Sequence, residues 1–259
     1  SVNKGIYHAS KDLVFILNSD AKLFPDYFKY QLVYFEKEDT FGVNGTIINW
    51  DNDQVQAGGK ILRFNALKIK SNVNYYLTDV DEERWYSTMF LSGTNMLLDR
   101  KKALMINGLD QLFDPFYVED IEFSLRALRM GWKLYYEPKS ICRHQISKTI
   151  QSHHRRKYIQ FLNIRNKYYM HCIHLSSIDL AGWFALTITT SFLRIFIGNI
   201  SYIKAFLALI RNYKGVIRSR QVFNNTAKVY TGDQTKDTRE VLTQLKREIL
   251  SYPIDKEFY

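Results

Sequence analysis

The chain of 259 residues has only two cysteines and no long uninterrupted hydrophobic run. Cys142 and Cys172 lie in unlike contexts without the close spacing of zinc ligands, which predicts a reducing compartment and no thiol chemistry. The longest apolar-rich stretch, 180–193, is interrupted by Thr and Ser and closed by Arg194. It falls short of the roughly 18–20 residues that a membrane-spanning helix needs, so we expect no such helix there.

Other common signatures are also missing. The first residues lack the basic and apolar regions of a secretory signal. The chain begins at Ser1, and we expect it to be part of a longer protein. No Gly-x-x-x-x-Gly-Lys-Ser/Thr phosphate loop occurs, which disfavours a metal-dependent nucleotidyltransferase or phosphotransferase. Internal repeats and low-complexity tracts are absent from the sequence.

Negative charge is scarce in one region. The whole chain has a formal net charge of +10. From Arg143 to Arg220, 13 Lys and Arg residues stand against one acid, Asp179, so this span carries +12. A regional basic block indicates nucleic acid, anionic lipid or a phosphate-bearing ligand as a partner.

Alternating strand and helix patterns predict an α/β fold. Residues 12–17 are continuously apolar, which is typical of a buried, parallel strand, and residues 40–49 form a second strand pattern. Residues 119–130 have the pattern of a helix, with acids in the first turn and Gly131 as the stop. Alternation over 132–137 predicts a strand that ends at Pro138.

The remaining segments are less regular. A helix is expected after the turn at 24–26, and 52–81 is interpreted as a variable excursion. Residues 90–98 form a strand pattern broken by Gly93. We divide the chain into a catalytic domain (1–150), a basic and apolar helical segment (151–220) and a charged tail (221–259).

Two acidic signatures stand where α/β sheets build their sites, at strand ends and helix starts. Asn18-Ser19-Asp20 follows the apolar strand pattern, and Glu119-Asp120 opens a helix. Ordinary alternatives exist for both, because Asn, Ser and Asp favour turns and because acids are favoured in the first turn of a helix.

Together the segments resemble a family 2 glycosyltransferase of the GT-A fold, a mixed sheet flanked by helices. The residues that carry the resemblance are Asn3-Lys4-Gly5, Asn18-Ser19-Asp20, Leu91-Ser92-Gly93-Thr94, Gly108-Leu109-Asp110, Phe116 to Glu122, Arg126 to Lys133, and His144 with Ser147. Members of this family begin with strands and a helix that hold the nucleotide base, and this chain lacks that early motif.

The resemblance implies roles for individual residues. It makes Asp120 the base that accepts the proton of the acceptor hydroxyl, with Glu119 beside it. It makes Asp20 a ligand of Mg²⁺ or Mn²⁺, and it assigns His144 to the same metal, although a lone His is as often a packed or surface residue. It places Asn18, Gly93, Thr94 and Arg126 at the substrate, where plain strand packing is the alternative for Gly93 and Thr94.

The resemblance also implies a bacterial enzyme that transfers a sugar from a nucleoside-diphosphate sugar to a glycan or lipid-linked acceptor, with inversion, in surface polysaccharide synthesis. Lys148, Arg155 and Arg156 could neutralise a diphosphate, or they could be solvated or face lipid.

Residues 180–213 predict a helix at a membrane interface. Lys204 and Arg211 share one helical face, and Ile200, Ile203, Phe206, Leu207 and Ile210 can form the opposite one. The alternative is a helix packed on the catalytic domain or on a partner. We expect a peripheral protein on the cytoplasmic face of an anionic membrane and no nucleic acid, although Tyr158, Phe161, Tyr168 and Tyr169 could stack on bases.

Overall fold

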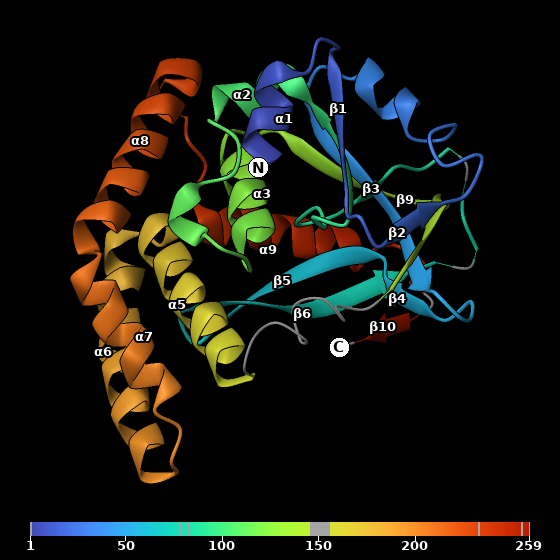
Figure 1. The fold of residues 1–259 in the computed structure, drawn as a ribbon. Helices are drawn as coiled ribbons and strands as arrows, with labels where there is room; N and C mark the ends of the chain where they lie inside the picture. The colour runs from blue at the N-terminus through green and yellow to red at the C-terminus, as the bar shows by residue number, and fades with distance from the viewer. Residues whose placement is uncertain are drawn as a thin grey trace.

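The computed structural model describes residues 2–77, 79–81, 83–145, 156–232, 234–254 and 256–258. A mixed sheet lies toward one side of the molecule, and most of the helices lie on the other side (Figure 1). Its strands lie in the order β1-β8-β3-β9-β2, with β4 beside β3 and β7 beside β9. They span β1 (Leu13–Leu17), β2 (Ala21–Leu23), β3 (Thr40–Asn49), β4 (Val55–Ala57), β7 (Tyr86–Ser87), β8 (Asn95–Asp99) and β9 (Lys133–His144). β3 and β9 are parallel, so the sheet is mixed as a GT-A-like fold requires.

The first strand lies at the edge of the sheet, and the prediction of a buried parallel strand is wrong. β1 pairs antiparallel with β8, with Leu13 opposite Asp99 and Leu17 opposite Asn95. Leu17 is 41% exposed, and the other side chains of β1 are half-buried. Within the described residues, β8 is the one strand beside it. A continuous apolar run indicates a strand but does not say whether both of its edges are paired.

The 52–81 excursion contains strands. β5 (Gly59–Asn65) and β6 (Lys68–Tyr76) form a hairpin, and β10 (Lys256–Phe258) adds a third strand in the order β10-β6-β5. Ile61, Leu62 and Val73 of the hairpin are buried in the main hydrophobic core. The sequence did not predict these strands because polar residues and glycines break the alternation.

Four further predictions can be compared with the structure. The helix expected after residues 24–26 is replaced by turns and a 3₁₀ helix, η1 (Leu32–Glu36). The strand expected over 90–98 begins only at Asn95, because 93–94 form a turn. The helix predicted over 119–130 is confirmed as α3 (Glu119–Arg129). The strand predicted to end at Pro138 continues as β9 to His144, with a shift of register opposite Gly45 and Thr46.

The remaining short elements lie near the start of α3. α1 (Val2–His8) packs beside α2 (Arg100–Met105), and η2 (Gln111–Phe113) follows. The Asn3 amide group donates to the Leu109 carbonyl oxygen at 2.7 Å, and its Oδ1 accepts from the Leu109 N–H at 2.8 Å. These bonds fix the 106–110 loop against α1.

The expected charged tail is folded against the catalytic domain. α9 (Thr238–Ile249) begins at the capping Asp237, whose side chain accepts from the N–H groups of Arg239 and Glu240. It packs on β5, β7 and α3, and buries Val241, Leu242 and Ile249. β10 then pairs with β6. The high content of charged residues did not indicate this packing, because α9 is amphipathic and exposes its charged face while it buries its apolar one.

Four helices form a layer beside the sheet domain (Figure 1). They are α5 (Arg156–His174), α6 (Ser177–Phe196), α7 (Ser201–Arg211) and α8 (Tyr213–Thr231). α6 has 20 residues and is the one helix, within the described residues, that is long and apolar enough to cross a membrane. The apolar stretch over 180–193 thus belongs to a longer helix than expected, in which Thr189 and Thr190 donate to the carbonyls of Ala185 and Leu186.

Candidate active site

Asp20 and His144 lie together at the end of the central sheet. β2 begins directly after Asp20 and pairs with the end of β9, so that Ala21 is opposite His144. Asp20 Oδ1 and His144 Nε2 are 3.3 Å apart, and the two side chains are 30% and 14% exposed. The carbonyl of Asp20 also accepts the Gln145 N–H at 3.0 Å. Two residues more than 120 positions apart thus present a carboxylate and an imidazole to the same space.

Gln56 supports the imidazole from the other side. Its Oε1 lies 3.4 Å from His144 Nδ1, and its Nε2 donates to the His144 carbonyl at 2.9 Å. A hydrogen on Nδ1 would leave the Nε2 lone pair directed at Asp20, which is the tautomer that a metal ligand requires. Gln56 was not predicted as part of the site because it lies in β4, within the apparent excursion.

The turn at residues 92–95 joins this pair of residues to the start of α3. The Asn18 N–H donates to the Thr94 carbonyl at 3.0 Å, and the Asn18 amide group reaches Thr94 Oγ1 at 3.5 Å. On the residue before Thr94, the Gly93 N–H donates to Asp120 Oδ2 at 3.3 Å. A β-carbon at Gly93 would lie 3.9 Å from the Asp120 carboxylate, so the backbone of this turn faces the acid directly.

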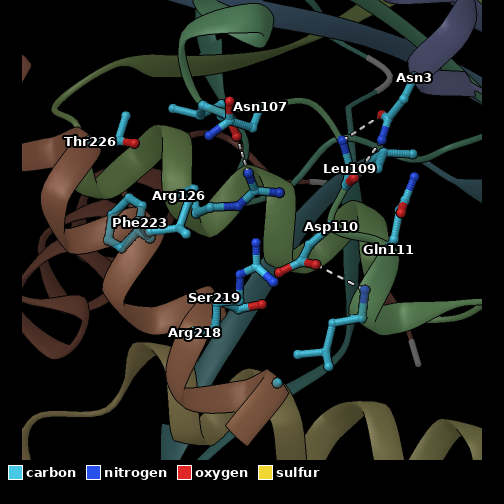
Figure 2. A pocket seen from close by; sticks show the side chains of 14 residues that line it. Asn3, Asn107, Leu109, Asp110, Gln111, Arg126, Arg218, Ser219, Phe223 and Thr226 are labelled. Atoms are coloured by element: carbon cyan, nitrogen blue, oxygen red, sulfur yellow. Dashed lines mark hydrogen bonds between the residues drawn. The ribbon is translucent and has the colours of Figure 1, made fainter.

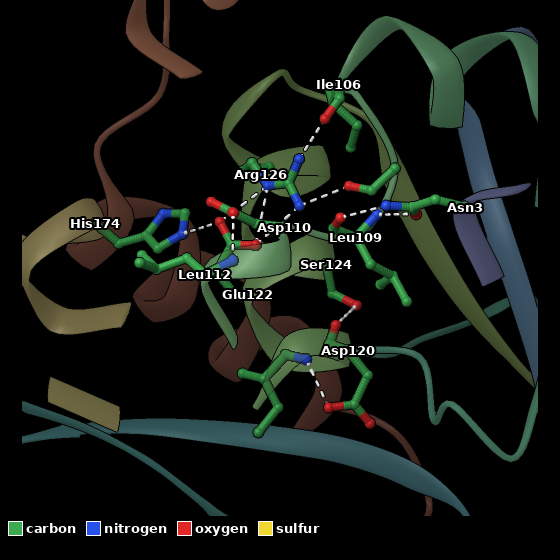
Figure 3. Close-up of polar contacts among 12 residues, drawn as sticks. Asn3, Ile106, Leu109, Asp110, Leu112, Asp120, Glu122, Ser124, Arg126 and His174 are labelled. Carbon is green, nitrogen blue, oxygen red and sulfur yellow. Dashed lines mark hydrogen bonds and ion pairs between the residues drawn. The ribbon is translucent and has the colours of Figure 1, made fainter. Parts of the chain in front are cut away.

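Asp120 is held in place by the first turn of α3. Its Oδ1 accepts the Ile121 N–H at 2.8 Å, and its carbonyl accepts the Ser124 hydroxyl at 2.7 Å (Figure 3). Burial raises the pKa of Asp120, while the bonds from Gly93 and Ile121 and the charge of Lys60 oppose that rise. Burial and the charge of Asp120 also raise the pKa of Glu119. The Oε2 of Glu119 is buried without a hydrogen-bond partner among the described residues.

Lys60 is a second residue near the acids that was not predicted from the sequence. It lies on β5, is buried, and donates from Nζ to Asn74 Oδ1 at 2.5 Å. Burial lowers the pKa of its ammonium group to about 8, and the charge of Asp120 counteracts this effect. A cation therefore lies close enough to Asp120 to favour its ionised form.

Arg126 lies in a buried ion pair (Figure 3). Its guanidinium group binds both carboxylate oxygens of Glu122 and donates to the carbonyls of Ile106 and Gly108. Its side chain is 7% exposed, and that of Glu122 is 1% exposed. Glu122 also contacts His174 Nε2 of α5 at 3.2 Å. These contacts give Arg126 a structural role, holding the 106–108 loop on α3, and the substrate-binding role implied by the resemblance stays a prediction.

A cavity of about 500 Å³ lies between α8 and the 106–112 loop (Figure 2). Asn3, Asp110, Arg126 and Arg218 are among the residues that line it. Asp20, Asp120 and His144 do not line this cavity. It therefore lies apart from the acidic residues that the sequence singled out.

Part of the predicted site falls on residues that the structure does not describe. Ser147, Lys148 and Arg155 lie within 146–155, outside the described residues. Arg156 opens α5 and is exposed. The possible contact of these basic residues with a diphosphate stays a prediction.

Comparison with known proteins identifies the family. Residues 1–182 match the family described as glycosyltransferase like family 2, and the chain belongs to this family. The match extends beyond the expected boundary at residue 150 and includes α5. A comparison with curated protein sequences gives no match.

Two solved structures match the chain. A crystal structure of GalNAc-T7 with UDP, GalNAc and Mn²⁺ has a TM-score of 0.61 at 12% identity, and the match covers 98% of this chain and 44% of that one. A mannosyltransferase, PcManGT from Pyrobaculum calidifontis, in complex with GDP-Man and Mn²⁺ has a TM-score of 0.41 at 12% identity, covering 96% and 65%. The first match supports the GT-A-like fold. The chain spans less than half the length of GalNAc-T7 and less than two thirds of PcManGT.

Proposed function

We propose that the protein transfers a sugar from a nucleoside-diphosphate sugar to a hydroxyl group of a lipid-linked glycan, with inversion, in the assembly of a surface polysaccharide. The observation that carries this proposal is the joining of the Asp20–His144 pair to Asp120 through the turn at 92–95. Within a glycosyltransferase-like family, this arrangement provides a place for the diphosphate beside a place for the acceptor. The surface-polysaccharide pathway is inferred from the family resemblance.

Asp20 and His144 fit a divalent cation. Two ligands on adjacent octahedral positions lie roughly 3 Å apart when each is 2.0–2.1 Å from the ion, close to the 3.3 Å between these atoms. Among the described residues no group of three His, Cys, Asp or Glu side chains could hold a metal. The donor phosphates would complete the coordination, and a carboxylate with an imidazole suits Mn²⁺ as well as Mg²⁺. When bound, the ion would stabilise the negative charge of the departing diphosphate.

Asp120 is suited to be the base. The acceptor oxygen forms a bond to the anomeric carbon, the bond from that carbon to the diphosphate breaks, and the acceptor proton passes to a carboxylate oxygen of Asp120. Attack from the side opposite the diphosphate inverts the anomeric centre. The Gly93 and Ile121 N–H groups and the Lys60 ammonium support the ionised carboxylate that accepts the proton.

The helical layer suits the anionic cytoplasmic face of a membrane. Phe192 and Phe196 of α6 are 54% and 87% exposed, and Leu207 and Ile210 of α7 are 43% and 53% exposed. On α7 the exposed apolar residues stand beside exposed Lys204 and Arg211 rather than on the opposite face, because Ser201, Ala205 and Leu209 face the protein. Apolar side chains among basic ones are typical of helices at an anionic interface. This position would bring a lipid-linked acceptor to the enzyme.

Of the four aromatic residues that could stack on bases, only Tyr158 is exposed, at 43%. Tyr168 and Tyr169 are 7% and 2% exposed, and Phe161 packs against the hydrophobic core. Side chains buried in this way cannot stack on bases. The positive charge of this region is thus better matched to lipid headgroups.

Titration of the chain with UDP, TDP and GDP, each with and without Mn²⁺, tests the proposed function. We expect heat of binding from one nucleotide only when Mn²⁺ is present, because two protein ligands alone provide an incomplete coordination shell. Metal-independent binding of all three nucleotides, or of none to the full-length folded protein, would contradict the proposal.

Reversing two charges on α7 tests the membrane surface. The double variant Lys204→Glu, Arg211→Glu is expected to bind vesicles of anionic lipid at least roughly 30-fold more weakly, at about 1 kcal/mol per basic residue near the surface. Flotation with anionic vesicles over a salt series measures this effect. Lys246→Glu with Arg247→Glu is the matched control, because these exposed residues lie on α9 and change the net charge equally. An equal loss in both variants would indicate a general effect of charge, and no loss in either would favour a packed helix.

A further inference from the structure

Asn166 makes an unusual set of contacts in the middle of α5. Its side chain is fully buried, and its Nδ2 group donates to the carbonyls of Phe113 at 2.8 Å, Phe116 at 3.1 Å and Tyr117 at 2.8 Å. All three acceptors belong to the loop that leads into α3. One side-chain amide group of α5 therefore binds three carbonyls of the backbone segment that directly precedes Glu119 and Asp120.

This loop has a strained backbone at its end. Tyr117 and Val118 have φ values of 77° and 74°, in the left-handed region that residues other than glycine rarely adopt. Val118 is β-branched, which makes this conformation still less favourable. Strained residues of this kind persist only where surrounding contacts hold them. The bonds from Asn166 to Phe116 and Tyr117 are such contacts.

Arg165 strengthens the clamp. Its Nε group donates to Asn166 Oδ1 at 2.9 Å, which leaves the Asn166 NH₂ group directed at the loop, and its Nη2 donates to the carbonyl of Asp114 at 2.5 Å. Arg165 and Asn166 of α5 together thus bind four backbone carbonyls of the loop. α5 itself packs on α7 and α8, so the clamp connects the acidic residues with the helical layer.

We propose that Asn166 is a positioning residue for sugar transfer: it holds the 113–118 loop in its strained form and so sets the position of the Asp120 carboxylate. This inference rests on the proposed function, since Asp120 is the base only there. Asn166 touches neither Asp120 nor Glu119 in its hydrogen bonds and acts through the backbone. Loss of its amide group would relax Tyr117 and Val118 and move the first turn of α3.

Asn166→Ala is the test, and Asn163→Ala is the matched control because Asn163 is half-buried one turn earlier on the same helix. We expect Asn166→Ala to lower kcat for transfer by about 100-fold, since a misplacement of 1 Å can have an effect of this size. The KM for the donor and its Mn²⁺-dependent nucleotide binding should not change. Hydrogen exchange should become at least tenfold faster in peptides covering 113–122 and stay the same in β3 and β9. Asn163→Ala should resemble the wild type in every measurement.

The alternatives give different results. An Asn166→Ala protein with wild-type kcat or wild-type exchange at 113–122 would overturn the proposal, as would equally faster exchange in β3 and β9, which indicates general destabilisation. If Asn166→Ala does not fold, Asn166→Ser retains one donor and should show a smaller change in both kcat and local exchange. If the wild type transfers no sugar, the proposed function has failed, and localised faster exchange then decides alone whether Asn166 holds the loop.

Discussion

Asp120→Asn is expected to lower kcat for sugar transfer by about 10²–10⁴-fold, the usual contribution of a general base. The substitution keeps the shape of the side chain and an oxygen to accept the Ile121 N–H, but it removes the charge and the second acceptor for Gly93. Binding of the nucleotide with Mn²⁺ should be unchanged, because Asp20 and His144 are intact. Initial rates with radiolabelled donor and calorimetric titration of the nucleotide measure the two effects separately.

Two variants control this experiment. Glu119→Gln should have a smaller effect than Asp120→Asn, because Glu119 is placed beside the proposed base and lacks a hydrogen bond to the Gly93 turn. Asp39→Asn should have no effect, since Asp39 is exposed and pairs with Lys133 at the surface. A larger loss in Glu119→Gln than in Asp120→Asn would transfer the role of base to Glu119. Equal losses of kcat and nucleotide binding in Asp120→Asn would argue for a structural role.

The pH dependence of the transfer rate is an independent test of Asp120 as the base. A base must be ionised to accept a proton, so the rate falls as the pH drops through its pKa. Burial raises the pKa of Asp120 above the ordinary value for Asp, about 3.9. Because this pKa belongs to the protein without substrate, the acid side of the kcat/KM profile should have its midpoint above the ordinary value for Asp. A midpoint at or below that value would argue against Asp120 as the titrating base.

The sequence predicted the parts of the site that depend on local pattern. The acids at the start of α3 and the turn after β1 are local features, and α3 and β3 were predicted close to their observed bounds. The prediction that His144 shares a site with Asp20 came from the family resemblance, and the pairing of β2 with β9 places the two side chains 3.3 Å apart. Their metal role stays a prediction.

Residues that depend on distant packing could not be predicted in this way. Gln56 and Lys60 lie on β4 and β5, strands that were not predicted from their sequence. Their side chains reach His144 and Asp120 only because β4 approaches β9 and β5 approaches α3. Asn166 was one residue among many in a basic segment, and its three acceptors are about 50 positions away. Arg126 was placed at the substrate by the family resemblance, and its burial beside Glu122 could not be predicted from local pattern.

Asp20→Ala is expected to remove most of the Mn²⁺-dependent binding of the nucleotide diphosphate. Loss of a residue that only supports a ligand typically costs 10–100-fold in metal affinity, so removal of the carboxylate itself should weaken binding by about 100-fold or more. His144→Ala should have an effect of the same kind, because its Nε2 faces the same space. Titration of nucleotide at several fixed Mn²⁺ concentrations measures the linked affinities.

Gln56→Ala separates ligation from general disruption. Its amide contacts His144 Nδ1 and the His144 carbonyl but neither Asp20 Oδ1 nor the Nε2 that faces it, so we expect a loss of about tenfold, smaller than that of either ligand. Asp26→Ala, in the exposed turn after β2, is the control and should bind as the wild type does. The loss of nucleotide affinity should therefore be largest for Asp20 and His144, smaller for Gln56 and absent for Asp26. This order follows from the distance of each side chain to the space between Asp20 Oδ1 and His144 Nε2. If Asp20→Ala binds nucleotide with unchanged dependence on Mn²⁺, the cation is held elsewhere, and the diphosphate would have to be placed away from the end of β1.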